Sequence, residues 1–143
     1  MANQQWTHLD AAQGKEGANE IQGEVKEGNV STPFSADVVV YRGSPQFEIT
    51  GEQYHSLPQD PADATGVLVR ILRATPPDGT YRVGEQPFGH AVILTPGDKL
   101  HLAESGFITV TNNPNTQEVS GEMHFVAGSV EIDATYKVSP QAL

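Results

Sequence analysis

The last third of the chain, from Gly106 to Val138, alternates apolar and polar residues on both sides of a turn-rich break at Asn112–Thr116. In its final run every second residue from Val130 to Val138 is apolar, and the residues between them are polar. A period of two places successive side chains on opposite faces of a strand, whereas a helix needs a period of about 3.6. The pattern therefore predicts β-strands with one buried face and one face in water.

Shorter runs of the same character lie upstream, separated by turn residues: Phe34–Tyr41, Gln46–Glu52, Val67–Leu72, Gly89–Thr95 and Lys99–Glu104. No segment sustains a helical period. About eight or nine short strands with turns between them predict an all-β fold, an antiparallel β-sandwich. A closed, lipocalin-like β-barrel is the alternative, because both architectures use such strands.

The alternation also predicts which side chains share a face. In the first upstream run one face holds Phe34, Ala36, Val38 and Val40, and in the second run Phe47 and Ile49 face inward. The two runs flank Gly43-Ser44-Pro45, so we expect them to form a hairpin. Val67–Leu72 is almost continuously apolar, which predicts a central strand covered in part on both faces.

The chain has 143 residues, a length that suits one domain with its own core. Residues 1–33 are almost wholly polar and contain several glycines. We therefore predict a polar N-terminal arm over 1–33, with 20–26 as a candidate edge strand. Residues 34–143 are expected to form a single β-sandwich domain.

Acidic residues outnumber basic residues by 18 to 8, and the formal net charge is −10. Nucleic acids and anionic membranes select for basic surfaces, so this charge argues against either as a partner. Cysteine is absent, which excludes disulfides and thiolate chemistry. No apolar run approaches the roughly 20 residues of a membrane-spanning helix. No glycine-rich phosphate loop is present, and we expect no cofactor.

The first residues, from Met1 to Trp6, show neither the basic region nor the apolar region of a signal peptide. The sequence as it stands predicts a cytoplasmic protein, or a protein of the cell envelope if a leader has been removed.

Several short motifs point to one protein family. They are Ala36-Asp37-Val38, Phe47 to Gly51, Asp78 to Tyr81, Ser105 to Thr111 and Val119 to Phe125. Together they resemble small bacterial β-sandwich proteins of uncharacterised function, many of them surface lipoproteins. The similarity covers Phe34 to Val138. The resemblance implies a β-sandwich fold, and the family has no established catalytic residues to carry over to this sequence.

Two histidines lie on the runs that flank Pro96-Gly97, a dipeptide typical of a tight turn. If a two-residue turn closes this hairpin, His90 and His101 share one face as diagonal neighbours, roughly 7–8 Å apart at Cα. Two imidazoles at this distance could ligate a divalent metal such as zinc with a third ligand from elsewhere. The alternative interpretation is two polar residues on the wet side of a sheet.

Two irregular stretches, Gln53–Thr65 and Asn112–Gln117, are the expected recognition surfaces, because loops on a rigid scaffold usually carry binding residues. The candidate binding residues within them are Tyr54, His55, Asp60, Asp63, Asn112, Asn113 and Asn115.

Catalytic patterns are weak in this sequence. No serine lies in a Gly-x-Ser-x-Gly turn. The sequence therefore favours a non-enzymatic binding or structural module whose partner is an unknown protein or small molecule. One alternative is a carrier of a small apolar ligand in a β-barrel cavity, and another is a hydrolase that depends on His90, His101 or His124. Self-association through edge strands is a further expectation.

Overall fold

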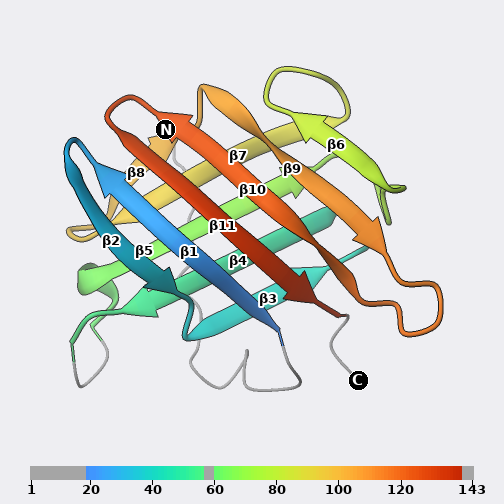
Figure 1. Ribbon diagram of the computed structural model, residues 1–143, viewed down its shortest axis with the longest axis horizontal. Coiled ribbons are helices and arrows are strands. Elements are labelled where there is room, and N and C mark those ends of the chain that lie inside the picture. The colour runs from blue at the N-terminus through green and yellow to red at the C-terminus, as the bar shows by residue number, and fades with distance from the viewer. Residues whose placement is uncertain (1–18, 57–59, 140–143) are drawn as a thin grey trace.

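The computed structural model describes residues 19–56 and 60–139, which form two antiparallel β-sheets packed face to face (Figure 1). Eleven strands and one short 3₁₀ helix make up this described part. Within residues 19–56 and 60–139 the two sheets remain open and do not close into a barrel. The predicted β-sandwich is thus confirmed, and the barrel alternative is wrong. No helix among the described residues has the length and apolar character needed to cross a membrane.

The first sheet has six strands in the order β2-β1-β11-β10-β9-β6. Their bounds are β1 Glu20–Glu27, β2 Val30–Ser35, β6 Gly79–Arg82, β9 Ser105–Asn112, β10 Val119–Ala127 and β11 Val130–Val138. The alternating stretch at the end of the sequence supplies β9, β10 and β11, which are adjacent in the sheet and joined by short turns. β11 shows the predicted alternation of buried and exposed residues.

The second sheet has five strands in the order β3-β4-β5-β7-β8. Their bounds are β3 Val38–Arg42, β4 Phe47–Tyr54, β5 Ala64–Ile71, β7 Phe88–Thr95 and β8 Lys99–Leu102, with the 3₁₀ helix η1 at Pro61–Asp63 between β4 and β5. The predicted hairpin of β3 and β4 is present. β5 is the central strand and seven of its eight residues are buried, as its continuous apolar run predicts. In Figure 1 the strands of this sheet cross behind those of the first.

The core lies between the two sheets. Its largest members are fully buried aromatic and branched side chains from both inner faces, including Phe34, Phe47, Phe125, Ile49 and Ile132. Burial of each such side chain stabilises the fold by roughly 1.5–3 kcal/mol relative to exposure. The filled core holds the two sheets in a fixed relation, and so positions the residues at their ends.

The run predicted as one strand over Phe34–Tyr41 is two strands in different sheets. The chain crosses between the sheets at Ala36 and Asp37, where Ala36 N–H donates to the Ile21 carbonyl (3.0 Å) and Asp37 N–H donates to the Glu52 carbonyl (2.7 Å). The crossing changes the phase of the alternation. β3 therefore turns Val39 and Tyr41 into the core between the sheets, on the side that Phe34 occupies in β2. Val38, which is also buried, and Val40 lie on the other face of β3, so the predicted common face of Phe34, Val38 and Val40 is wrong.

The predicted edge strand at 20–26 is also corrected. β1 lies inside the first sheet, between β2 and β11, and pairs with both along most of its length. The edges of this sheet are β2 and β6. Residues 20–33 thus belong to the sandwich, so the predicted boundary at residue 33 does not separate arm from domain. The remainder of the predicted arm, residues 1–18, lies outside the described residues.

The turn between β7 and β8 has three residues instead of the expected two. Thr95 pairs with Lys99, which leaves Pro96, Gly97 and Asp98 in the turn. Asp98 adopts a left-handed conformation with φ of 56°. Asp tolerates this conformation better than most residues, because its short polar side chain forms local hydrogen bonds. The extra residue shifts the register of β8 by one position relative to the prediction.

Candidate functional site

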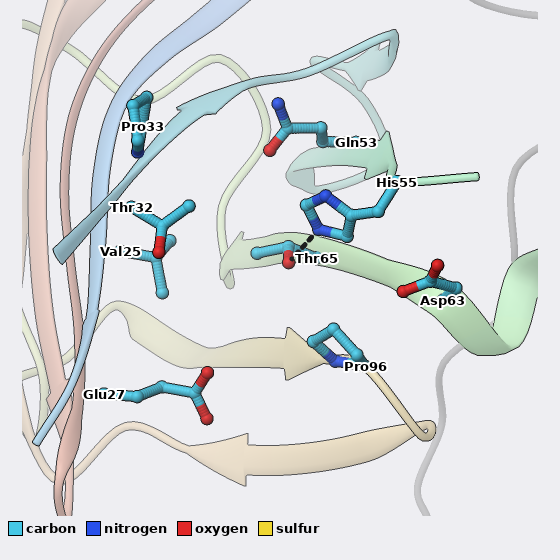
Figure 2. A pocket seen from close by; sticks show the side chains of 9 residues that line it. All are labelled: Val25, Glu27, Thr32, Pro33, Gln53, His55, Asp63, Thr65 and Pro96. Atoms are coloured by element: carbon cyan, nitrogen blue, oxygen red, sulfur yellow. Dashed lines mark hydrogen bonds between the residues drawn. The ribbon is translucent and has the colours of Figure 1, made fainter. Parts of the chain in front are cut away.

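A cleft of about 250 Å³ opens at one end of the sandwich (Figure 2). It is lined by Val25, Glu27, Thr32, Pro33, Gln53, His55, Asp63, Thr65 and Pro96. The first four belong to β1 and β2 of the six-stranded sheet. The others come from β4, β5 and the connections at the end of the five-stranded sheet. The cleft therefore has one wall from each sheet.

The position of the cleft follows from a change of residue type along the strands. On the inner face of β4, Phe47 and Ile49 are fully buried, and Gln53 occupies the same face near the strand end. Gln53 pairs with Thr65 of β5, and Thr65 lies on the same face of that strand as the buried Val67. Because the last inward positions are polar, the apolar core ends there. The space beyond it is open to solvent.

One imidazole–hydroxyl hydrogen bond lies in the cleft wall, and a second lies beside it in the same sheet. His55 Nε2 is 2.7 Å from Thr65 Oγ1, and His101 Nε2 is 2.9 Å from Thr95 Oγ1. Gly66 of β5 pairs with Leu94 of β7 in antiparallel register, so Thr65 and Thr95 are the next two residues opposite each other on these strands. The four side chains thus form a polar row along the cleft end of the five-stranded sheet.

The connection that carries His55 and Asp63 is held by its own backbone. His55 N–H donates to the Asp63 carbonyl at 3.0 Å, which closes the base of the loop. The carboxylate of Asp60 accepts from Ala62 N–H at 3.0 Å and caps η1. Gly97 N–H donates to the Ala62 carbonyl at 2.6 Å, so η1 is tied to the β7–β8 turn. These bonds give the cleft a fixed rim.

Gln53 contributes the most unusual atom of the cleft. Its side-chain oxygen Oε1 is buried and has no hydrogen-bond partner among the described residues. A buried acceptor without a partner costs about 1–3 kcal/mol relative to a satisfied one. In Figure 2 this oxygen faces the space between the two walls.

The electrostatic character of the lining is one-sided. Glu27 and Asp63 contribute carboxylates, and neither lysine nor arginine is among the lining residues. Gln53 and Thr65 add neutral oxygens. Val25, Pro33 and Pro96 supply apolar surface. Both walls thus combine polar acceptors with apolar surface.

The predicted metal pair does not form, because the register of β8 differs from the expectation. His101 pairs with Ile93, which is fully buried on the inner face, and bonds to Thr95 on the same face. His90 lies three residues before Ile93 and so faces outward, opposite Arg70. The two imidazoles are thus on opposite faces of the sheet. Among the described residues no group of three His, Asp or Glu side chains is arranged to hold a metal.

His90 instead belongs to a charged row on the outer face. Its partner Arg70 contacts Glu48, with Nη2 3.2 Å from Oε2. Partial burial of the imidazole lowers the pKa of His90, the positive charge of Arg70 lowers it further, and Glu48 opposes both. The row is an arrangement of the sheet surface, away from the cleft.

The residues predicted from the first loop separate into two groups. His55 and Asp63 line the cleft. Asp60 caps η1, and Tyr54 is on the outer face, where its hydroxyl donates to Glu52 at 2.5 Å. Glu52 is fully buried there. The loop thus contributes His55 and Asp63 to the cleft lining, whereas Asp60 and Tyr54 make internal contacts.

The predicted residues of the second loop lie at the opposite end of the first sheet. Glu27 and Ala127 both pair with Val130 at the cleft end, whereas Asn112 pairs with Val119 at the other end of β10. Asn112 donates through its backbone and side chain to Asp78, at 2.8 Å each. These hydrogen bonds lower the pKa of Asp78.

The rest of that loop is held by a bond of its own. The Asn113 side chain accepts from Asn115 N–H at 2.9 Å, which is a local turn. These asparagines shape their loop and do not reach the cleft.

The sequence-based predictions missed Glu27, Gln53 and Thr65, among others. One signal could have indicated two of them. Gln53 and Thr65 are polar residues at positions that the two-residue period assigns to the core, at the ends of their strands. A polar residue at an inward position is a candidate for a site, because burial without a partner is costly.

Comparisons of the sequence with protein-family models and with curated proteins, and of the structure with solved structures, found no match. The resemblance to small bacterial β-sandwich proteins therefore stays a prediction, and the site is interpreted from its own geometry.

Proposed function

We propose that this chain is a non-enzymatic binding module and that the cleft at the end of the sandwich is its recognition site. The observation that carries the proposal is a cleft of about 250 Å³ that is lined from both sheets and has the polar side chains of Gln53 and Thr65 where the apolar core ends. Small-molecule pockets typically have volumes of about 300–1,000 Å³, so the cleft fits a small ligand or a single side chain of a partner.

The contact between His55 and Thr65 is the closest approach to a catalytic arrangement. A hydroxyl beside an imidazole is the first half of a nucleophile–base pair, which also needs an acid to orient the base. No hydrogen bond or ion pair within residues 19–56 and 60–139 joins the His55 ring to a carboxylate. The arrangement therefore supports binding more than hydrolysis.

An apolar carrier is also less well supported than a polar binding site. A carrier needs an enclosed apolar cavity, and the carrier hypothesis assumed that a closed β-barrel provides this cavity. The core between the two open sheets is filled by large side chains such as Phe34, Phe47 and Phe125. The cleft in turn is rich in polar side chains, which favours a polar ligand.

Amide chemical shifts of the ¹⁵N-labelled full chain would test the proposal. A panel of small neutral, cationic and anionic compounds is titrated, and we expect saturable shifts centred on Gln53, His55 and Thr65 for at least one of them. Asn113→Ala, at the opposite end, should leave the shifts unchanged, whereas Thr65→Val should reduce them. If no compound shifts the cleft, or if all shifts lie elsewhere, the proposed function is wrong.

A further inference from the structure

We infer that the outer face of the five-stranded sheet is a docking surface for the N-terminal segment of the same chain, residues 1–18. This face is the side of the sheet that turns away from the six-stranded sheet, and it is the far side in the view of Figure 1. The inference depends on the apolar character of the face, on the burial of its side chains, and on the place where the segment joins the domain. It concerns a different surface from the cleft and does not rest on the proposed function.

The outer face is apolar over much of its width. Val67 and Val69 of β5 face the core between the sheets, so Leu68 faces outward. Leu68 pairs with Val92 of β7. The strand registers place these apolar residues on the face: Val38, Leu68, Val92, Leu94, Leu100 and Leu102. The solvated face of an antiparallel sheet normally carries polar residues, so this composition indicates a face that is covered.

Three of these side chains are shielded from solvent although they lie outside the core between the sheets. Val38 and Leu94 are each 1% exposed and Leu68 is 6% exposed. Val38 belongs to β3, an edge strand, so it has a neighbouring strand on one side only. On the outer face of the other sheet, Thr135 is exposed although β11 has strands on both sides. Neighbouring strands therefore do not explain the burial, and further chain covers the face.

A buried carboxylate on the same face gives independent support. Glu52 pairs with Val38, is 0% exposed, and accepts a hydrogen bond from the Tyr54 hydroxyl at 2.5 Å. Removal of a carboxylate from water is costly, and water would reach Glu52 on an uncovered face. Its burial thus indicates that the cover extends over the β3–β4 side of the sheet.

The described elements do not supply this cover. All eleven described strands belong to the two sheets, and η1 comprises only Pro61–Asp63 at one end of β5. The stretches 57–59 and 140–143, which lie outside the described residues, are too short to cross from β3 to β7. The burial also occurs within a single chain, so it needs no second copy. These points leave residues 1–18 as the occupant.

The segment joins the domain beside this face. Asn19 directly precedes β1, and its side chain accepts from Ser139 N–H at 2.9 Å. The carbonyl of Ile21 accepts from Ala36 N–H at 3.0 Å, where the chain crosses into β3. The segment therefore starts near the β3 edge. Five strands span about 19 Å, and an extended chain of this length reaches about 60 Å, so the segment is long enough.

The composition of the segment suits an apolar surface below it and water above it. Trp6 and Leu9 are large apolar side chains in a mostly polar stretch. An aromatic side chain buries about 150–250 Å² of surface, so Trp6 is the main anchor of the contact. The polar residues around it face solvent.

Fluorescence of the full chain tests the inference, because Trp6 is its only tryptophan. We expect emission at a shorter wavelength, and weaker quenching by acrylamide, than in the urea-unfolded chain. Leu68→Gln places a polar group on the face, and it should shift the emission to longer wavelength and increase the quenching. Leu102→Gln is the matched control, because Leu102 lies on the same face but is 64% exposed on the edge strand β8. Its emission should equal that of the wild type.

A spin label provides a measurement that leaves the face unaltered. The chain has no cysteine, so Gln13→Cys offers a single attachment site. In the ¹⁵N-labelled full chain we expect the label to broaden the amide signals of Leu68 and Leu94. The amide signal of Asp133, which lies on β11 of the other sheet with an exposed side chain, should keep its width.

Three results would overturn the inference. The first is Trp6 emission and quenching equal to those of the unfolded chain. The second is broadening that is absent at Leu68 and Leu94, or that occurs only around the cleft. The third is the same broadening in a mixture of spin-labelled ¹⁴N chain and unlabelled ¹⁵N chain, because this result would make a second copy the occupant.

Discussion

The phenol of Tyr136 donates a hydrogen bond to the backbone carbonyl of Thr109 at 2.6 Å, across the strand that lies between them. The contact is possible because that strand has a glycine at the crossing point. A Cβ on Gly121 would lie 2.2 Å from the same carbonyl oxygen. Thr109 Oγ1 also accepts from Glu122 N–H at 2.9 Å. At this point of the sheet, hydrogen bonds from side chains thus take the place of backbone hydrogen bonds between β9 and β10.

Removal of the Tyr136 hydroxyl should be costly. Tyr136 is almost fully buried, and burial raises the pKa of its phenol. Tyr136→Phe leaves the Thr109 carbonyl without this donor, so we expect the free energy of unfolding to fall by about 1–3 kcal/mol in urea denaturation. Tyr81→Phe is the control. Its hydroxyl donates to the Pro77 carbonyl in an exposed contact, and we expect a loss within about 0.5 kcal/mol. Equal stability of Tyr136→Phe and the wild type would refute the assignment.

Gln53 is expected to reduce the stability of the fold. Gln53→Met removes the buried oxygen, which has no partner among the described residues, and keeps a side chain of similar length. The free energy of unfolding should therefore rise, by up to about 1–2 kcal/mol, in urea denaturation. Gln46→Met, at an exposed position before β4, should leave the free energy of unfolding unchanged. A variant that is less stable than the wild type would show that the oxygen is satisfied in solution.

His90 should make stability depend on pH below neutrality. Its pKa is lowered in the folded state, so the unfolded chain binds more protons between the two pKa values. The free energy of unfolding should consequently fall as the pH decreases through about 6.5, the ordinary value for histidine, and should gain nothing further above it. His90→Asn should flatten this dependence between pH 7.5 and 5.5 in urea denaturation.

A second variant separates the two causes of the shift. Arg70→Gln removes the neighbouring positive charge, and the pKa of His90, followed by NMR of the ring protons, should rise but remain below its ordinary value. A pKa that does not change would show that burial alone is responsible.

Asp78 should control the order of the loop after β9. Its carboxylate accepts from Asn112 backbone N–H and from the side-chain amide, at 2.8 Å each. Asp78→Ala should therefore speed hydrogen exchange at the Asn112 amide, and Asp133→Ala should not. Unchanged exchange in Asp78→Ala would mean that the backbone of the loop is held by other contacts.

The sequence predicted the fold class because each strand carries its own two-residue period. Phe47, Ile49 and the alternation of β11 were identified in this way, since local spacing determines them. The period gives no sign of a change of sheet. At Ala36 and Asp37 the chain crosses to the other layer, and the phase of the next strand changes with it.

Local sequence patterns predict neither the three-residue turn between β7 and β8 nor the complete lining of the cleft. Pro96-Gly97 suggested a two-residue turn, and the left-handed Asp98 extended it by one, which moved His101 to the other face. His55 and Asp63 were identified as loop residues. Glu27 was not, because it reaches the cleft only when the first sheet packs on the second.

The cleft takes one wall from each sheet, so it exists only while the sheets are docked. A ligand that contacts both walls binds the native state and not the separated sheets. At a concentration one hundred times its dissociation constant it would add about 2.7 kcal/mol to the free energy of unfolding. Occupancy of a small surface site would thus be reported by the thermal unfolding of the whole sandwich, and a shift in melting temperature would detect a ligand before its chemistry is known.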